Sequence, residues 1–401
     1  MALHRRISVT AVLALAATIA TTGAAVAATA TPPSAAARAG VVTSVAATTG
    51  KPAAAPVFQG SLPAPTGRFA AGEDVIHLTD FGRTDPWVPS AGPRQLTVSM
   101  FYPAVAGTGT QAPYMTLAEA AGFIQYRVPP NTGITAQELS DVTTHAYTAA
   151  RAVHGKYPLV VLSPGFENPR TTLTSLATEL ASHGYVVALV GHTYEDSGET
   201  LGNGQTPPCA ICDGSSPTAP SPDDITASRA KDVSFVIDQL TRGGGCAWRL
   251  SGLIDKHSIG MAGHSIGGAA TVDTMIADPR VLAGVNLDGT FFPVPAAGQI
   301  KRPYLMMSHG LQDPTWTQTY ANLGGYKRWL DVAGSSHATF TDIPLLAQEA
   351  GIPEPPGIDP LRGTVITREY VTAFFDQSLK GIHQPLLDGP TPGNPDVLFQ
   401  Y

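Results

Sequence analysis

The sequence has few charged residues, few cysteines and no long apolar run of membrane-spanning length. Only 14% of its 401 residues are Asp, Glu, Lys or Arg, whereas 43% are hydrophobic, so the chain can bury a sizeable core. The net charge is −7 and no basic run stands out, which argues against a nucleic-acid partner. The length allows one large catalytic domain or two medium ones.

The N-terminal residues have the pattern of a targeting segment. Basic residues at 4–6 precede a short apolar stretch at 7–20, and Ala25-Val26-Ala27 is a small-residue cleavage site. The apolar stretch is too short and too rich in Ala for a good membrane span, and no later segment replaces it. We therefore expect a signal peptide at 1–27, secretion, and no stable membrane insertion. Residues 28–60, rich in Ala, Thr and Pro, are expected to form a flexible leader.

The chain has three cysteines, an odd number that cannot all pair within one chain, which is unusual for a protein of an oxidising compartment. Cys209 and Cys212 form a C-x-x-C pair within a Pro/Gly/Ser-rich loop, and Cys246 lies in a glycine-rich segment. No further ligands at zinc spacing lie nearby, and a redox pair would be expected at a helix start. We expect one cysteine of the pair to form a disulfide with Cys246 and the third to be free or to exchange; the sequence does not determine which.

Strand and helix patterns alternate from about residue 61 onward. Continuous apolar runs at 157–162 and 185–192 are typical of strands covered on both faces, and the stretch from 221 to 245 reads as a long helix with a capping serine. This alternation predicts an α/β fold, a single domain over 61–401 with a mostly parallel central sheet and helices on both faces. Ligands bind beyond the carboxyl ends of such strands, so chemistry is expected there.

One serine stands at such a strand end in a G-x-S-x-G context. Ser265 lies between an apolar strand and an Ala-rich helix, with Gly263 and Gly267 on either side. A sharp strand-to-helix turn exposes the serine oxygen, and glycines avoid clashes across that turn. The helix start directs amide hydrogens toward the serine and favours negative charge there. The pattern predicts a catalytic nucleophile.

A serine nucleophile needs a base and a carboxylate to orient it. His337 follows the last strand in a loop of small residues and is the expected base; His309, directly after the preceding strand, is the rival. Asp288 and Asp313 compete as the acid, and either one gives the chain order Ser, Asp, His that is typical of hydrolases.

A tetrahedral intermediate also needs two backbone donors for its oxyanion. The amide of Ile266, just past the nucleophile, and that of Phe166, in the loop after the first buried strand, are the expected pair. His192, Tyr194 and Glu195 follow the next strand, where pocket lining and structural hydrogen bonding are equally consistent with their positions.

Together these residues resemble the plasma-type platelet-activating factor acetylhydrolases and their bacterial relatives in the α/β-hydrolase superfamily. The resemblance runs from about Leu62 to Gly381, and its best pieces are LSPGF, GHSIGG, LDGTFFP and SSHATFTD. It implies an α/β-hydrolase fold with Asp288 as the acid, because in that family the acid follows the strand next after the nucleophile's. It also implies cleavage of short or oxidised acyl esters, often of phospholipids, without a metal or cofactor. A lid-like insertion around 110–155 is expected to cover the site.

The sequence therefore predicts a secreted serine esterase with Ser265, Asp288 and His337 as its triad, acting on small-molecule esters or lipids. A secreted polyester hydrolase is an alternative, as is an exported binding protein on a hydrolase scaffold whose chemistry has been lost. A peptidase on the same fold is a further reading, which the absence of a propeller-sized N-terminal domain disfavours. Acyl length and oligomeric state stay open.

Overall fold

The computed structural model describes residues 58–212, 216, 218–242, 247–310 and 313–400. The expected signal peptide, nearly all of the expected leader and Cys246 lie outside these ranges. Within them, no helix combines the length and apolarity that crossing a bilayer requires. The domain limits inferred from the sequence stay predictions.

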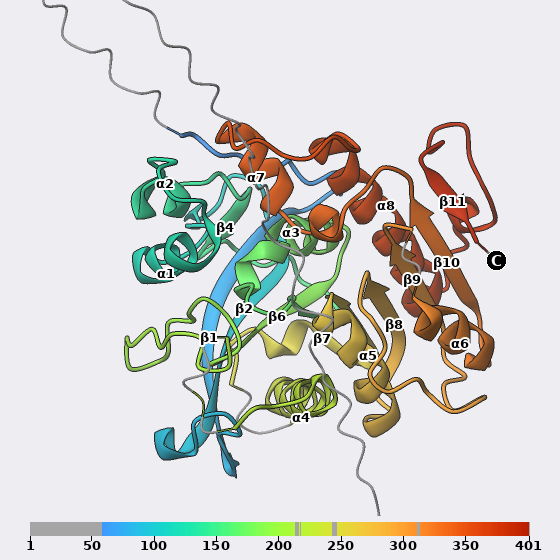
Figure 1. The fold of residues 1–401 in the computed structure, drawn as a ribbon, viewed down its shortest axis with the longest axis horizontal. Helices are drawn as coiled ribbons and strands as arrows, with labels where there is room; N and C mark the ends of the chain where they lie inside the picture. The colour runs from blue at the N-terminus through green and yellow to red at the C-terminus, as the bar shows by residue number, and fades with distance from the viewer. Residues whose placement is uncertain (1–57, 213–215, 217, 243–246, 311–312, 401) are drawn as a thin grey trace, which may run out of the picture. The chain divides into compact units, whose positions relative to one another are not determined.

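The described strands form one 11-stranded sheet in the order β11-β10-β9-β8-β7-β5-β6-β2-β1-β4-β3 (Figure 1). The strands are β1 (Ala70–Thr84), β2 (Pro93–Ala104), β3 (Thr110–Gln111), β4 (Ala146–Thr148), β5 (Tyr157–Ser163), β6 (Val186–His192), β7 (Ile254–His264), β8 (Val281–Leu287), β9 (Tyr304–Ser308), β10 (Lys327–Val332) and β11 (Val397–Phe399). The strands from β6 to β10 in this order pair in parallel. The antiparallel partners β1 and β2 extend the sheet beyond β6, and β11 closes its other edge.

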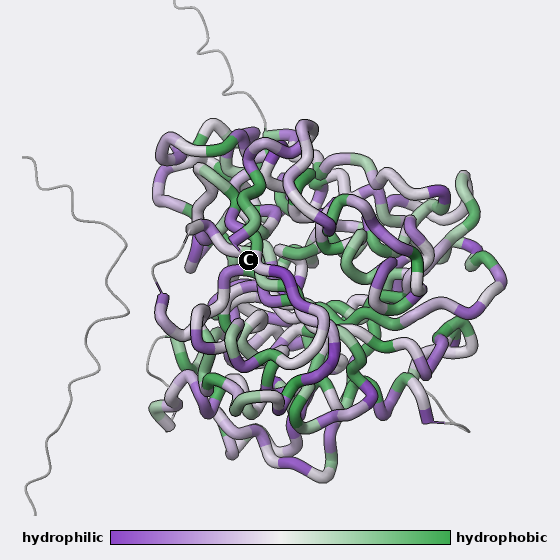
Figure 2. Tube along the Cα trace, turned by 90° about the vertical axis from the view of Figure 1, so that its right-hand side faces the viewer, coloured by the Kyte–Doolittle hydropathy of each residue, from purple (hydrophilic) through white to green (hydrophobic). Residues whose placement is uncertain are grey.

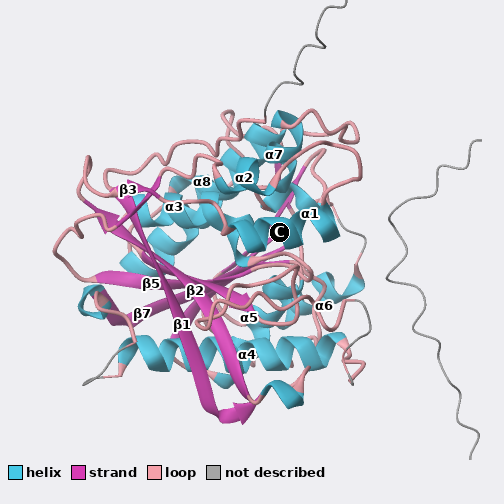
Figure 3. Cartoon of the chain, turned by 90° about the vertical axis from the view of Figure 1, so that its left-hand side faces the viewer, coloured by secondary structure: helices cyan, strands magenta, loops and turns pink. Residues whose placement is uncertain are grey.

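Helices cover both faces of the sheet (Figure 3). The α-helices are α1 (Leu117–Arg127), α2 (Ala136–Ser140), α3 (Thr174–Ser182), α4 (Pro222–Thr241), α5 (Ile266–Ala277), α6 (Pro314–Asn322), α7 (Ile343–Glu349) and α8 (Pro360–Lys380), with 3-10 turns at η1 (Pro89–Ala91), η2 (Arg170–Leu173), η3 (Ser251–Leu253), η4 (His337–Phe340) and η5 (Pro385–Leu387). Helices α4, α5 and α6 pack on one face, and α3 and α8 pack on the other. The predicted α/β-hydrolase architecture is confirmed.

The central strands are apolar throughout because both faces of the sheet are covered. In β5, Leu159 and Val161 point into the core under α4 and α5, whereas Val160 and Leu162 point into the core under α3 and α8. This alternation follows from the two-residue repeat of a strand. Figure 2 shows hydrophobic segments in the middle of the molecule, where the central strands run.

The long helix after β6 begins as its sequence predicts. Ser221 caps α4 by accepting a hydrogen bond from the Asp224 amide, and the Asp224 carboxylate in turn accepts one from the Ser221 amide. Pro222 occupies the first turn, where no amide hydrogen is needed.

The insertion between β2 and β5 has a small core of its own and also extends the sheet. Its strand β4 pairs in parallel with β1, and β3 pairs with β4. Its helices α1 and α2 pack around Phe123 and Leu139, together with Leu346 of α7. Because α7 follows the segment that carries His337, the insertion meets the part of the chain in which the base is expected.

Candidate active site

Ser265 occupies a strained turn between β7 and α5. Its φ and ψ are 55° and −126°, a left-handed conformation that a residue with a side chain rarely adopts. Its amide donates to Leu287 O at 2.8 Å, which holds the turn against the end of β8. A Cβ at Gly263 would lie 2.2 Å from the Gly267 carbonyl, so the tight bend tolerates no side chain there. The half-buried serine thus lies at the carboxyl edge of the sheet, as expected.

Asp288 lies at the end of β8 and is buried, with 2% of its surface exposed. Its Oδ2 atom accepts hydrogen bonds from Nδ1 of His337 at 2.5 Å and from Nδ1 of His309 at 2.7 Å. Its Oδ1 atom accepts the His309 amide at 2.9 Å. Burial by itself would raise the pKa of Asp288, but the hydrogen bonds from His309 and His337 hold that pKa below its usual value. The carboxylate is therefore ionised and tied to two histidines.

The proton positions on His337 follow from this contact. A carboxylate only accepts, so Nδ1 of His337 carries the proton and Nε2 is free to act as a base. The His337 side chain begins η4 and is 52% exposed, which leaves it open to solvent and substrate.

His264 connects the serine turn to this histidine. The residue precedes Ser265, and its Nε2 donates to His337 O at 2.8 Å, with the two imidazole rings 4.7 Å apart. Burial and the neighbouring His337 lower the pKa of His264 to about 3, so it is neutral. Among the described residues no hydrogen bond joins the Ser265 hydroxyl to the His337 ring; in unliganded enzymes such contacts commonly tighten only when substrate binds.

The loop after β5 passes over the same turn. A Cβ at Gly165 would lie 2.8 Å from Nδ1 of His264, and one at Gly267 would lie 2.2 Å from Ser163 O. The Phe166 amide has no acceptor among the described residues, and Ile266 is the first residue of α5, where an amide has no intrahelical acceptor. Neither amide, each expected to be an oxyanion donor, thus has a hydrogen-bond acceptor in the part of the chain that the structure describes.

Asp313, the alternative acid, lies elsewhere and caps a helix. Its Oδ1 accepts from the amide and the hydroxyl of Thr315 at the start of α6. The structure brings Ser265, Asp288, His337 and the Phe166 loop together, whereas Asp313 has a structural partner of its own. His309, the rival base, is bound to the same carboxylate as His337.

The cysteine prediction is wrong. Cys209 forms a disulfide with Cys212, not with Cys246, which lies outside the described residues. The turn between the two brings their Cα atoms within 5.3 Å, a separation that a disulfide spans readily. The loop composition that argued against a redox pair is compatible with this local bridge.

Two clusters in the described ranges combine side chains of metal-binding type. One is Asp288 with His309 and His337; the other is His192 with Glu195 and Asp232. In both, a histidine ring nitrogen is already hydrogen-bonded to a carboxylate. We assign no metal to either cluster.

A mostly apolar cavity of about 160 Å³ lies between the insertion and α7. Phe123, Ile134 and Leu346 are among the residues that line it. Arg127, the last residue of α1, also lines it and forms an ion pair with Glu167 at 2.8 Å, one residue after Phe166. The cavity therefore adjoins the loop that carries Phe166, the first of the two expected oxyanion donors.

Sequence reasoning missed two buried charges beneath this loop, Arg229 and Asp232 of α4. Both are 1% exposed or less and belong to a network with His192 and Glu195. A signal was present: Arg229 and Asp232 lie four and seven residues after Ile225, on the helix face that is buried.

Comparison with known proteins points to one family. Residues 62–202 and 243–377 match the family model described as platelet-activating factor acetylhydrolase, isoform II. A protein of Arthroderma benhamiae named as a probable 1-alkyl-2-acetylglycerophosphocholine esterase is 27% identical over 381 residues, covering 84% of this chain and 93% of its own. A platelet-activating factor acetylhydrolase of Bos taurus is 29% identical over 178 residues, 39% of this chain and 40% of its own.

A solved structure is also similar over nearly its whole length. A ferulic acid esterase from Streptomyces cinnamoneus superposes with a TM-score of 0.75 at 39% identity, covering 85% of this chain and 99% of its own.

Proposed function

The chain belongs to the platelet-activating factor acetylhydrolase isoform II family and is a carboxylic ester hydrolase, and from this premise we propose that it is a secreted serine esterase. The observation that carries the proposal is the hydrogen bond from His337 Nδ1 to Asp288, beside the strained turn of Ser265. This contact leaves Nε2 of His337 available to take a proton from the serine hydroxyl.

In the proposed mechanism, Oγ of Ser265 attacks the acyl carbon of the ester while His337 accepts the hydroxyl proton. The carbonyl oxygen becomes an oxyanion that accepts hydrogen bonds from the amides of Phe166 and Ile266. The bond to the alcohol oxygen then breaks as His337 returns its proton to that oxygen. Water, deprotonated by His337, attacks the acyl-enzyme, which releases the acid and restores Ser265.

The substitution Ser265→Ala tests the nucleophile. Hydrolysis of p-nitrophenyl esters of rising chain length is expected to fall by about four orders of magnitude or more, because only binding and oxyanion stabilisation would remain. The matched control is Ser258→Ala, in the first half of β7, which should hydrolyse the esters like wild type. Equal rates for wild type and Ser265→Ala would overturn the proposal.

A fluorophosphonate probe gives a second readout. Covalent labelling at Ser265 requires an activated hydroxyl, so it separates an esterase from an inactive binding protein on the same scaffold. Absence of labelling in the intact chain would favour the inactive scaffold.

Secretion is proposed from the N-terminal pattern and has its own test. Expression of the full chain with its leader is expected to release a protein that begins near Ala28 into the medium. Retention of an N-terminus at Met1 would contradict this part.

A second candidate is an esterase of aromatic acids. The cavity of about 160 Å³ supports it, because an apolar cavity of about 150 Å³ is large enough for a benzene ring. The structural neighbour described as a ferulic acid esterase agrees with this reading. Leu346→Trp should fill the cavity and raise KM for methyl ferulate about 10-fold, with p-nitrophenyl acetate unaffected. Leu361→Trp, at an exposed position of α8, is the control.

A further inference from the structure

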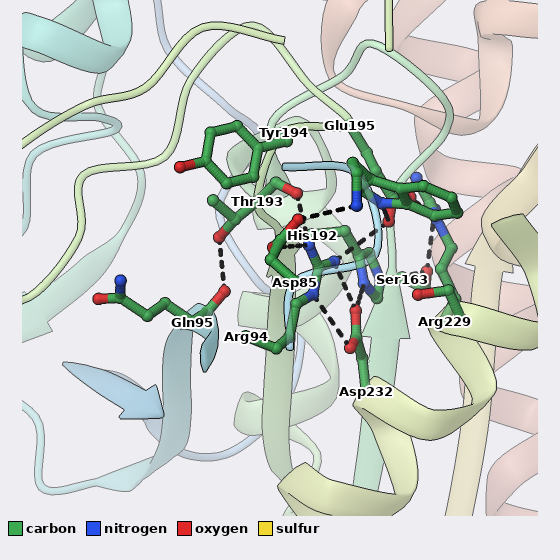
Figure 4. Close-up of polar contacts among 12 residues, drawn as sticks. Asp85, Arg94, Gln95, Ser163, His192, Thr193, Tyr194, Glu195, Arg229 and Asp232 are labelled. Carbon is green, nitrogen blue, oxygen red and sulfur yellow. Dashed lines mark hydrogen bonds and ion pairs between the residues drawn. The ribbon is translucent and has the colours of Figure 1, made fainter. Parts of the chain in front are cut away.

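A buried network of charged side chains joins α4 to the end of β5 and to the segment after β6, next to the loop that carries Phe166. Figure 4 shows its central residues, among them Arg94, Glu195 and Arg229. Its buried members are two arginines, Arg94 and Arg229, and three carboxylates, Asp85, Glu195 and Asp232. Arg83, which is partly exposed, pairs with Asp232 and with Asp80 at the edge of the network. Nothing in the proposed mechanism uses these groups, and burying them is costly unless each one is paired.

Arg229 of α4 binds the residues that precede Phe166. Its NH1 group donates to Pro164 O and to the Ser163 hydroxyl, the latter at 3.2 Å. Its Nε donates to Glu195 Oε2 at 2.7 Å. The guanidinium thus joins the end of β5 to the segment after β6.

Glu195 in turn holds the residue that follows Phe166. Its backbone carbonyl accepts the Glu167 amide at 3.0 Å. Its carboxylate also accepts Nε1 of Trp87 at 2.7 Å and NH2 of Arg94 at 3.1 Å, so its place is fixed from several sides. Arg229 and Glu195 therefore hold the chain two residues before Phe166, at Pro164, and one residue after it, at Glu167.

Ser163 at the start of the loop is anchored further by His192 and Asp232. Nδ1 of His192 donates to Asp232 at 2.9 Å, so Nε2 accepts the Ser163 hydroxyl hydrogen at 3.0 Å. Burial and the charge of Arg229 lower the pKa of His192, which keeps the ring neutral as this pattern requires. The order of groups is that of a catalytic triad, but Ser163 is fully buried, so an ester does not reach it.

We propose that Arg229 and Glu195 are positioning residues that hold the Phe166 amide where the oxyanion forms; this inference rests on the proposed esterase function. Glu167 adopts a φ of 64°, and a strained residue persists only where its surroundings fix it. A displacement of about 1 Å in a reacting group reduces turnover about 100-fold, so a loop without regular structure needs such anchors.

The test is Arg229→Lys, which keeps the charge and loses the forked donor geometry. Arg368 offers a matched control, because it is also buried, pairs with Glu179 and donates to two backbone carbonyls, those of Pro63 and Ala64. It lies on α8, which packs on the opposite face of the sheet from α4. Arg368→Lys should therefore share any general effect of disturbing a buried arginine.

Both variants are measured per active site, with sites counted by fluorophosphonate titration. Arg229→Lys is expected to lower kcat for p-nitrophenyl acetate about 10- to 100-fold with KM nearly unchanged, because a missing oxyanion donor acts on the transition state. It should weaken a trifluoromethyl ketone inhibitor, which forms an oxyanion on Ser265, by the same factor. Arg368→Lys should change neither value.

Equal per-site losses in the two arginine variants, or an unchanged inhibitor constant in Arg229→Lys, would overturn the inference. If Arg229→Lys does not fold, Ser163→Ala replaces it as the test variant. It removes one contact each of Arg229 and His192, and should lower kcat and inhibitor affinity together by a smaller factor; unchanged values would equally overturn it. The esterase proposal fails separately, if Ser265→Ala retains full activity.

Discussion

His309 and His337 donate to the same atom, Oδ2 of Asp288, from the ends of neighbouring parallel strands. The shared carboxylate makes their charges interdependent. The hydrogen bond to Asp288 raises the pKa of His309, and the charges of Asp288 and Asp331 add to this effect.

The first prediction concerns the acidic limb of the pH–rate profile. The hydrogen bond to Asp288 raises the pKa of His309, so this ring carries a positive charge beside the catalytic carboxylate at acidic pH, and the neutral Gln side chain removes that charge. In His309→Gln the pH of half-maximal kcat/KM should therefore move upward, by about half a unit. The control is His383→Gln, an exposed histidine paired with Asp388. A downward shift, or the same shift in both variants, would contradict this reading.

The second prediction separates the two candidate acids. Asp288→Asn should lower kcat about 10⁴-fold, because the neutral amide no longer holds His337 in the required tautomer. Asp313→Asn should leave kcat unchanged, since asparagine also caps a helix well. Steady-state kinetics with p-nitrophenyl butyrate measure kcat in both variants. A loss of kcat in Asp313→Asn but not in Asp288→Asn would show that Asp313 is the acid.

The third prediction concerns the glycine that follows the nucleophile. A Cβ at Gly267 would lie 2.2 Å from Ser163 O and 2.5 Å from Pro164 O, so Gly267→Ala must displace the loop that carries Phe166. Activity is expected to fall about 100-fold or more. Gly252→Ala, where an added Cβ meets no atom within 4 Å, should retain wild-type activity. Wild-type kinetics in Gly267→Ala would show that the loop tolerates movement.

The fourth prediction concerns stability and pH. Asp342 accepts hydrogen bonds from the Ser175 amide and the Tyr114 hydroxyl, and burial raises its pKa to about 8. Between about pH 4 and pH 8 the folded state keeps a proton that the unfolded state has lost, so the free energy of unfolding falls as pH rises. An asparagine side chain does not titrate between these pH values, so the substitution of Asp342 by Asn removes this pH dependence.

Asp342→Asn should therefore gain stability relative to wild type as pH rises from 5 to 8, by about 1 kcal/mol for each pH unit. Urea unfolding at several pH values measures this difference. Asp141→Asn, at an exposed position after α2, is the control and should show no such trend. A difference that is constant across the range would contradict the expected protonation state.

Much of this arrangement follows from sequence pattern alone. Strands covered on both faces read as apolar runs, and parallel strands end at one edge of the sheet. Ser265, Asp288 and His337 could therefore be placed together because each follows a strand. The choice between Asp288 and Asp313 was different, since both follow strands and both suit the chain order, and the resemblance to a family favoured Asp288. In the structure Asp288 accepts a hydrogen bond from His337, whereas Asp313 accepts from Thr315.

Other features depend on distances that sequence spacing does not determine. His309 was judged only as a rival to His337, whereas in the fold it is a second donor to the same carboxylate. The partner of Cys209 was sought far along the chain, although a tight turn brings Cys212 close enough. Arg229 and Glu195 are 34 residues apart, and only the packing of α4 against the end of β6 makes them a pair.

The proposed nucleophile, acid and base lie in the segments that follow β7, β8 and β10, whereas most residues that line the apolar cavity come from the insertion between β2 and β5 and from α7. Reactive groups and cavity lining thus occupy separate stretches of the polypeptide. Replacing the insertion with that of a related hydrolase, or randomising α7, should therefore change which esters are preferred without altering the residues proposed to catalyse their hydrolysis.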